Sequence, residues 1–218
     1  MSRELHEQYR PTRWEDVVGQ TDALRVISAI RRRGLSGRAW WISGASGTGK
    51  TTIARLIASE IADPLNIEEY DAGRLSDKSI EEIERSLRCY RIGEKTGAAI
   101  LINEAHGLKA PVVRQLLVSL ERIPTHATWI FTTTISGQLS LFGKNDDASP
   151  LLSRCVCLSL KSTGVEMDFA VRARKIAQAE CLDGAPIFDY IEMAGQCRCN
   201  MREMLHRIES GAMLTAEA

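Results

Sequence analysis

The chain has 218 residues, and its 28 lysines and arginines balance its 28 aspartates and glutamates, so its formal net charge at pH 7 is zero. This balance excludes a uniformly basic nucleic-acid coat protein and an acidic, solvating tail. Hydrophobic residues make up 44% of the chain and charged residues 26%, a composition that excludes intrinsic disorder and is typical of a globular protein.

The beginning of the sequence and its cysteines indicate an intracellular protein. The first residues carry no apolar run of the kind that a secretory signal needs, and no segment approaches the roughly 20 apolar residues of a membrane span. Without a secretory signal the six cysteines are expected to be reduced thiols that pack as small hydrophobic side chains. We therefore expect a cytoplasmic location and no membrane partner.

Short apolar segments alternate with amphipathic segments of helical length along most of the chain. This alternation predicts an α/β fold with a parallel sheet. The five strands are expected at 39–43, 67–70, 98–103, 129–133 and 156–160, with helices at 50–62, 79–90 and 111–121 between them. The segment 98–102 is apolar at every position, as is typical of a central strand that is covered on both faces.

The pattern changes near residue 161. From residue 166 onward strand patterns give way to three helical stretches, which predicts a small helical domain at 162–218 after an α/β domain at 1–161. Before that boundary, the segment 135–150 is rich in Gly, Ser, Asp and Asn. It is expected to form a long loop, and long loops inside compact domains are usually functional.

The strongest motif is a phosphate-binding loop at 44–51, Gly-Ala-Ser-Gly-Thr-Gly-Lys-Thr. It follows an apolar strand and precedes a helix, which is the context that the G-x-x-x-x-G-K-[ST] pattern requires. The glycines allow successive backbone N–H groups to face phosphates, and the helix that begins at the loop adds its positive dipole end. The residues predicted to bind the nucleotide are Gly44, Gly47, Thr48, Gly49, Lys50, Thr51 and Thr52, with Lys50 on the β- and γ-phosphates and Thr51 on Mg²⁺.

The strand at 98–103 ends in Asn103 and is followed by Glu104. Phosphate-loop ATPases place a carboxylate at this strand end to hold Mg²⁺ through water, and a glutamate after it to activate the attacking water. Glu104 fits the second role. Asn103 stands where the carboxylate is expected, and a neutral amide there predicts a weaker hold on Mg²⁺.

Four further motifs carry a family resemblance. They are Tyr-Arg-Pro at 9–11, Trp-Glu-Asp-Val-Val-Gly-Gln at 14–20, Ser-Arg-Cys at 153–155 and Asn-Met-Arg at 200–202. Together with the phosphate loop and Glu104 they occur in the order found in AAA+ ATPases, and the chain resembles the clamp-loader subunits of that family, of the replication factor C and bacterial DNA polymerase III gamma/tau type. The resemblance implies an AAA+ domain with a five-stranded parallel sheet and a helical lid. The family's C-terminal collar has no counterpart in these residues.

The resemblance also implies roles for individual residues. Val17 and Val18 would lie against the adenine, and Thr134 would act as the sensor near the γ-phosphate. Arg154 would act as an arginine finger in the site of a neighbouring subunit, and Arg202 of the lid would reach over the phosphates. Cys199 stands where the family usually has a glycine, which predicts a differently shaped loop before Arg202.

These residues imply an ATPase that uses ATP and Mg²⁺ to open or load a sliding clamp on DNA, with hydrolysis weakened by Asn103. One alternative is a nucleotide-binding assembly subunit with little hydrolysis, which Asn103 favours. Another is a different AAA+ DNA remodeller, for branch migration or helicase loading.

The expected partners are other AAA+ subunits in a ring, a sliding clamp and primed DNA. Three adjacent arginines, Arg31 to Arg33, offer a basic cluster, but three charges specify little, and no motif for sequence-specific reading is present. The segment 138–142, Gln-Leu-Ser-Leu-Phe, matches a peptide that docks on bacterial clamps, in which Gln138, Leu139, Leu141 and Phe142 would make the contacts. The alternative is that its apolar side chains hold the loop against the ATPase core.

Overall fold

A five-stranded parallel sheet forms the centre of the protein. The computed structural model describes residues 4–89, 91–134 and 148–214. The strands are β1 (Arg38–Ser43), β2 (Ile67–Asp71), β3 (Ala98–Asn103), β4 (Ala127–Thr133) and β5 (Cys155–Ser159). Their order in the sheet is β2-β3-β4-β1-β5, and every neighbouring pair is parallel. The predicted α/β fold with five parallel strands is therefore confirmed.

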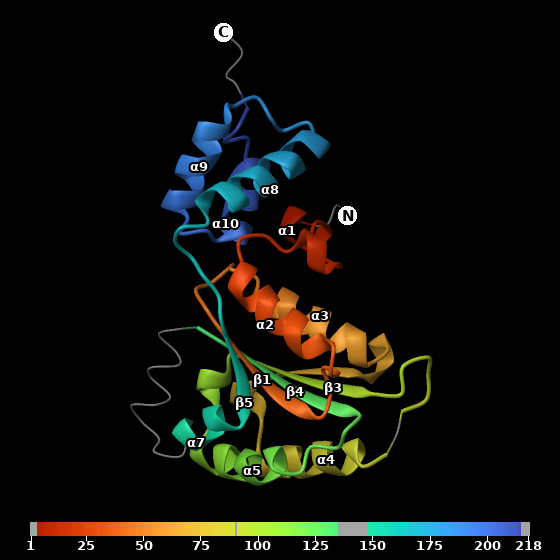
Figure 1. Ribbon diagram of the computed structural model, residues 1–218. Coiled ribbons are helices and arrows are strands. Elements are labelled where there is room, and N and C mark those ends of the chain that lie inside the picture. The colour runs from red at the N-terminus through yellow and green to blue at the C-terminus, as the bar shows by residue number, and fades with distance from the viewer. Residues whose placement is uncertain (1–3, 90, 135–147, 215–218) are drawn as a thin grey trace.

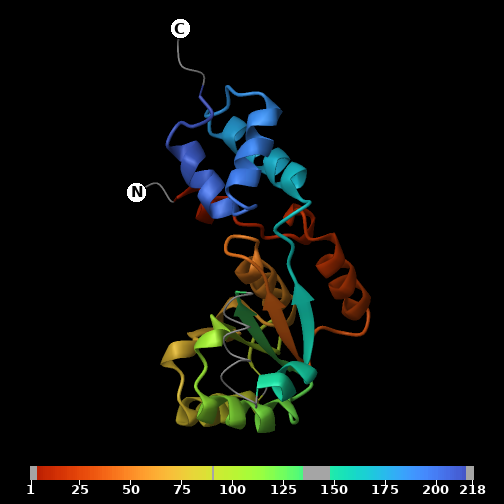
Figure 2. The same ribbon diagram turned by 90° about the vertical axis from the view of Figure 1, so that its left-hand side faces the viewer.

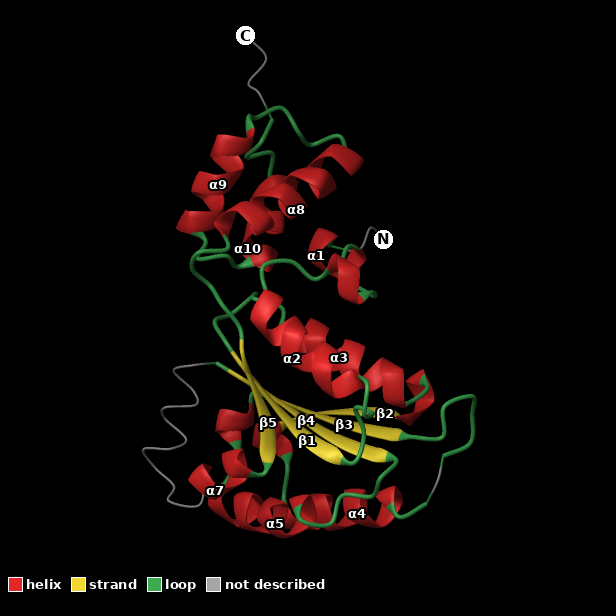
Figure 3. Ribbon diagram, in the orientation of Figure 1, coloured by secondary structure: helices red, strands yellow, loops and turns green. Residues whose placement is uncertain are grey.

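Helices cover both faces of the sheet (Figure 1). The helices are α1 (Leu5–Gln8), α2 (Thr21–Arg31), α3 (Lys50–Ile61), α4 (Asp77–Leu87), α5 (Ala110–Leu120), α7 (Ala148–Ser153), α8 (Glu166–Ala179), α9 (Ile187–Gln196) and α10 (Met201–Glu209). The helices α2 and α3 lie on one face and α4 and α5 on the other, as the colouring by secondary structure in Figure 3 makes clear.

The strand β3 explains why this arrangement is stable. Its side chains alternate between the two faces, so Ala98, Ile100 and Ile102 pack with α4 and α5 while Ala99 and Leu101 pack with α3. All five are fully buried. A strand that is apolar at every position therefore contributes to two hydrophobic cores at once, as the sequence predicted for 98–102.

The helices α8, α9 and α10 form a separate apolar cluster beyond the end of β5 (Figures 1 and 2). The three helical stretches expected after residue 166 are present. The short helix α1 joins this cluster, because Leu5 is 5% exposed and packs among its side chains. No helix in the described ranges is long and apolar enough to cross a membrane.

Gln20 ties the two parts of the chain together. Its side-chain NH₂ donates to the carbonyl oxygens of Lys161 (2.9 Å) and Thr48 (3.4 Å), and its Oε1 accepts from the Lys161 N–H (2.9 Å). The residue is only 2% exposed. One buried amide therefore links the start of α2 to the phosphate loop and to the segment that leads to α8.

Replacing Gln20 by alanine is expected to lower the free energy of unfolding by about 1–3 kcal/mol, because partners of buried hydrogen bonds are left unsatisfied. Urea unfolding of the variant and the parent measures this difference. Gln8→Ala is the matched control, since Gln8 is exposed and its side-chain amide donates to Glu180 at the surface. Equal losses in the two variants would contradict the linking role of Gln20.

Candidate nucleotide-binding site

The phosphate loop connects β1 to α3 and is shaped by two glycines. Gly47 and Gly49 have φ angles of +71° and +100°, in the left-handed region that glycine adopts without strain. Gly47 also lies under α10. A Cβ atom added to it would come within 1.7 Å of the Asn200 Oδ1 atom, and its carbonyl accepts a hydrogen bond from the Met201 N–H at 3.2 Å. The loop thus needs glycine at 47 both for its turn and for contact with the lid helix.

Lys50 is the first residue of α3 and is 8% exposed. Its ammonium group donates to the carbonyl oxygens of Gly44 (3.1 Å) and Ala45 (2.8 Å). Burial lowers the pKa of Lys50, the positive charge of Arg202 lowers it further, and the carboxylate of Glu104 opposes both. Within the described ranges no carboxylate forms an ion pair with Lys50. A buried cation whose hydrogen bonds go to neutral carbonyls is suited to an incoming anion.

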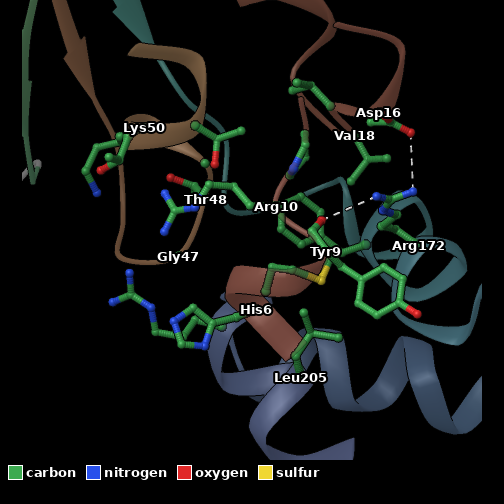
Figure 4. Close-up of a pocket in the computed structure, with 18 of the residues that line it drawn as sticks. His6, Tyr9, Arg10, Asp16, Val18, Gly47, Thr48, Lys50, Arg172 and Leu205 are labelled. Carbon is green, nitrogen blue, oxygen red and sulfur yellow. Dashed lines mark hydrogen bonds and ion pairs between the residues drawn. The ribbon is translucent and has the colours of Figure 1, made fainter. Parts of the chain in front are cut away.

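A pocket opens beside this loop, between it and the helical cluster (Figure 4). Of the predicted residues, it is lined by Val17, Val18, Gly47, Thr48, Gly49, Lys50, Thr51, Thr52, Glu104 and Arg202. The pocket has an apolar wall that includes Val18, Phe169, Ile176 and Leu205. It therefore combines an apolar surface for a base with the cations Lys50 and Arg202 and backbone N–H groups for phosphates, which fits a nucleoside triphosphate.

Arg172 and Tyr9 line the pocket but were not among the residues predicted to bind the nucleotide. Arg172 of α8 reaches the Asp16 Oδ1 atom (3.4 Å) and the Tyr9 carbonyl oxygen (3.5 Å), and Figure 4 shows both contacts. The Tyr9 hydroxyl donates to Glu180 at 2.6 Å. These bonds fasten the amino-terminal segment to the helical cluster. The Tyr-Arg-Pro motif was a signal for Tyr9, whereas no sequence pattern singled out Arg172.

The end of β3 carries the two residues predicted to support hydrolysis. Glu104 has φ +51° and ψ +47°, a left-handed conformation that is strained for a residue with a side chain and that recurs at functional sites. It lines the pocket, whereas Asn103 lies just outside the lining. The Asn103 Oδ1 atom accepts a hydrogen bond from the Thr132 hydroxyl at 2.9 Å.

Thr134, Gly44 and Arg154 also lie outside the pocket lining. Gly44 begins the phosphate loop, and its N–H bonds to the carbonyl of Thr133 at the end of β4, next to Thr134. Arg154 is far from the pocket. It precedes β5, which pairs in parallel with β1 and sets Arg154 level with Arg38. Six residues of extended strand, about 20 Å, therefore separate it from the loop that follows β1.

Arg154 is held in place by neighbouring residues on its own chain. It donates to the Pro150 carbonyl oxygen at 3.0 Å and forms an ion pair with Glu121 at the end of α5. The hydrogen bond from Arg154 lowers the pKa of the Glu121 carboxyl. Arg154 therefore lies at the amino-terminal end of the strands, whereas the phosphate loop lies at their carboxyl end.

The loop before Arg202 contains a cysteine in a conformation that glycine favours. Cys199 has φ +53° and is fully buried, and Arg198 before it has φ +51°. The Cys199 N–H bonds to the Ala194 carbonyl oxygen at 2.8 Å, and Asn200 then caps α10 by accepting from the Glu203 N–H. Arg202 lines the pocket despite the missing glycine. The four predicted clamp-docking residues, Gln138, Leu139, Leu141 and Phe142, lie outside the described residues.

A family model described as "ATPase family associated with various cellular activities (AAA)" matches residues 41–141. These residues are therefore similar to an AAA ATPase domain. The match runs from β1 through the phosphate loop and Glu104 to the end of β4. It confirms the resemblance to the AAA ATPase family over these residues.

The relatives that match the chain include a DNA polymerase III subunit and a Holliday junction branch migration subunit. DNA polymerase III subunit gamma/tau of Mycoplasma pneumoniae is 28% identical over 88% of this chain and 33% of its own length. The Holliday junction branch migration complex subunit RuvB of Prosthecochloris aestuarii is 38% identical over 55% of this chain and 33% of its own length. The chain therefore spans about a third of each of these two relatives.

The fold is shared with solved structures. The RuvB Holliday junction branch migration motor of Thermotoga maritima superposes with a TM-score of 0.71 and 22% identity, over 92% of this chain and 64% of that one. This match shows that the two proteins share the fold, a parallel α/β domain followed by a helical region in this chain.

Proposed function

We propose that the chain is an ATP-hydrolysing subunit of the clamp-loader type, which opens or loads a sliding clamp on primed DNA. Its composite site would combine Lys50, Thr51, Asn103, Glu104, Thr134 and Arg202 of one subunit with Arg154 of the next. When bound, ATP supplies the free energy of hydrolysis and Mg²⁺ neutralises its phosphate charge. The α/β domain at 1–161 would act as the motor and the helices at 162–218 as its lid.

The position of Arg154 is the observation that carries this proposal. An arginine finger must reach the phosphates of a different subunit, so it has to lie away from the phosphate loop of its own chain. Arg154 lies at the end of the strands opposite to the phosphate loop and is held by Glu121. Ser-Arg-Cys is also the motif that favours clamp loaders over other AAA+ branches, and the gamma/tau relatives support that choice.

Each catalytic step is assigned to a side chain. Lys50 would donate to the β- and γ-phosphates, and Glu104 would take the proton of the attacking water. Arg202 of the lid would hold the phosphates from above, where it already lines the pocket beside Met201. Thr134 would orient the water from the end of β4.

Arg154→Ala is expected to reduce ATP hydrolysis by about 10³-fold while ATP affinity changes little, because a finger stabilises charge that develops in the transition state. Steady-state ATPase rates and equilibrium titrations separate the two effects. Arg122→Ala is a nearby control, since Arg122 is an exposed arginine just after α5.

Mixing Arg154→Ala with Glu104→Gln protein gives a second test of the finger. Some interfaces then combine an intact Glu104 site with an intact Arg154 from the neighbour, so part of the activity should return. If assembled mixtures stay inactive, Arg154 does not act between subunits.

The partner is tested by association with a bacterial sliding clamp. Light scattering of the full chain with Mg²⁺ and a non-hydrolysable ATP analogue is expected to show an oligomer, and addition of the clamp is expected to increase its mass. The double variant Leu141→Ala with Phe142→Ala tests docking through the motif at 138–142 most specifically, because it removes the two apolar side chains expected to enter the clamp. Calorimetry should then show weaker clamp binding, and unchanged affinity in a folded double variant excludes docking through this peptide.

Two other functions have specific support. The 38% identity to a RuvB subunit favours a branch-migration motor, which would respond to four-way DNA junctions rather than to a clamp. Asn103 favours an assembly subunit that binds ATP with little turnover. ATPase rates measured with junction DNA, with clamp and primed DNA, and without DNA separate these functions.

A further inference from the structure

Three polar side chains meet on the α3 face of the sheet, near the ends of their strands. Side chains alternate along a strand, and Ala99 and Leu101 of β3 pack against α3. Asn103 therefore falls on the same face. The register between β2 and β3 sets Glu69 opposite Leu101, which brings Glu69 to this face as well, and Thr132 on β4 completes the group.

Hydrogen bonds connect this group in one line. The Asn103 Nδ2 atom donates to Glu69 Oε1 at 2.5 Å, and the Asn103 Oδ1 atom accepts from Thr132 at 2.9 Å. The other carboxylate oxygen of Glu69 accepts from Arg55 Nη2 at 2.9 Å and Nε at 3.3 Å. Arg55 is the last residue of this line of hydrogen bonds. It lies one helical turn after Thr51 on α3, beside the predicted magnesium ligand.

This line fixes the orientation of the Asn103 amide. An ionised carboxylate accepts hydrogen bonds and cannot donate them, so only the Nδ2 end of the amide can face Glu69. The Oδ1 end then points away from Glu69, and it keeps a second lone pair beyond the one that Thr132 uses. A hydrogen bond to an ionised partner is also stronger than one to a neutral partner, which increases the negative charge on Oδ1.

We propose that Glu69 is a positioning residue of the magnesium–nucleotide site and supplies, through Asn103, the negative charge that this strand end lacks. The inference rests on the proposed function, because it takes Asn103 as the residue that holds a Mg²⁺-bound water. The negative charge that an aspartate would carry at the end of β3 is instead carried by Glu69 on the neighbouring strand β2. Glu69 acts on the metal through Asn103 and does not touch the nucleotide itself.

Glu69→Gln tests this proposal with a readout other than activity. Binding of a fluorescent ADP analogue is titrated at increasing Mg²⁺ concentrations and in EDTA. The variant is expected to need about tenfold more Mg²⁺ for the same affinity, the lower end of the effect that outer-shell partners have on metal binding. Its affinity in EDTA should equal that of the parent.

Glu68→Gln is the matched control. Glu68 precedes Glu69 on β2 but faces the other side of the sheet, where it bonds to Arg91 at 3.1 Å and to the Tyr70 hydroxyl at 2.6 Å. This variant removes the same charge from the same strand and should leave the Mg²⁺ dependence unchanged. Equal Mg²⁺ dependence in Glu69→Gln and Glu68→Gln overturns the proposal.

The exchange variant Asn103→Asp with Glu69→Gln separates charge from simple packing. It keeps one amide and one carboxylate in contact but returns the negative charge to β3. The Mg²⁺ concentration that it needs for a given nucleotide affinity is expected to be equal to or lower than that of the parent. A requirement as high as that of Glu69→Gln overturns the proposal. A parent chain that binds no nucleotide overturns the proposed function and this inference together, whereas normal binding with unchanged Mg²⁺ dependence in Glu69→Gln overturns only the inference.

Discussion

Lys50→Ala is expected to reduce ATP affinity by about 100-fold or more. Hydrogen bonds to charged groups contribute about 1.5–3 kcal/mol each, and the buried ammonium can make more than one to the phosphates. A loss of about 3 kcal/mol corresponds to roughly a 100-fold change in the dissociation constant. Titration of a labelled ATP analogue, monitored by fluorescence, measures the change.

Lys78→Ala is the control for this prediction, because Lys78 is an exposed residue of α4. It should bind ATP as the parent does. Since Lys50 also bonds to two carbonyls of its own loop, the thermal unfolding of the variant is compared with that of the parent. A folded Lys50→Ala protein with unchanged affinity contradicts the assignment of the phosphate loop.

Glu104→Gln is expected to retain ATP binding and to lose hydrolysis by about 10²–10⁴-fold, because an amide cannot take the proton of the attacking water. Glutamine has nearly the same size as glutamate and tolerates the same left-handed backbone equally poorly, so the fold should be unaffected. Single-turnover hydrolysis and equilibrium binding distinguish the two steps. Glu94→Gln is the control, because Glu94 is exposed and does not line the pocket; it should leave binding and hydrolysis unaltered. A fully active Glu104→Gln protein rules out Glu104 as the base.

The strands could be predicted because each contains a run of three to five consecutive apolar residues, apart from the polar edge strand β2. The helix α2 was not predicted. Only Ala23 and Ile27 of α2 are buried, and Val26 is 40% exposed, so its apolar stripe is narrow. The helices α1 and α7 span only four and six residues, too few for a helical period to emerge.

The site was predictable where its residues are close in sequence. The phosphate loop is one continuous motif, and Glu104 follows its strand directly. Arg172 reaches the pocket only because α8 packs on the amino-terminal segment, a contact between distant parts of the chain. The pairing of Asn103 with Glu69 depends on the register of β2 and β3, which the composition of either strand does not reveal.

The most direct test of the proposed function is the ATPase rate of the full chain with a bacterial sliding clamp and primed DNA. The clamp-loader proposal predicts that the two together accelerate hydrolysis well beyond either alone, and that Arg154→Ala removes the acceleration. A rate that is unchanged by clamp and primed DNA but raised by four-way junction DNA would contradict it.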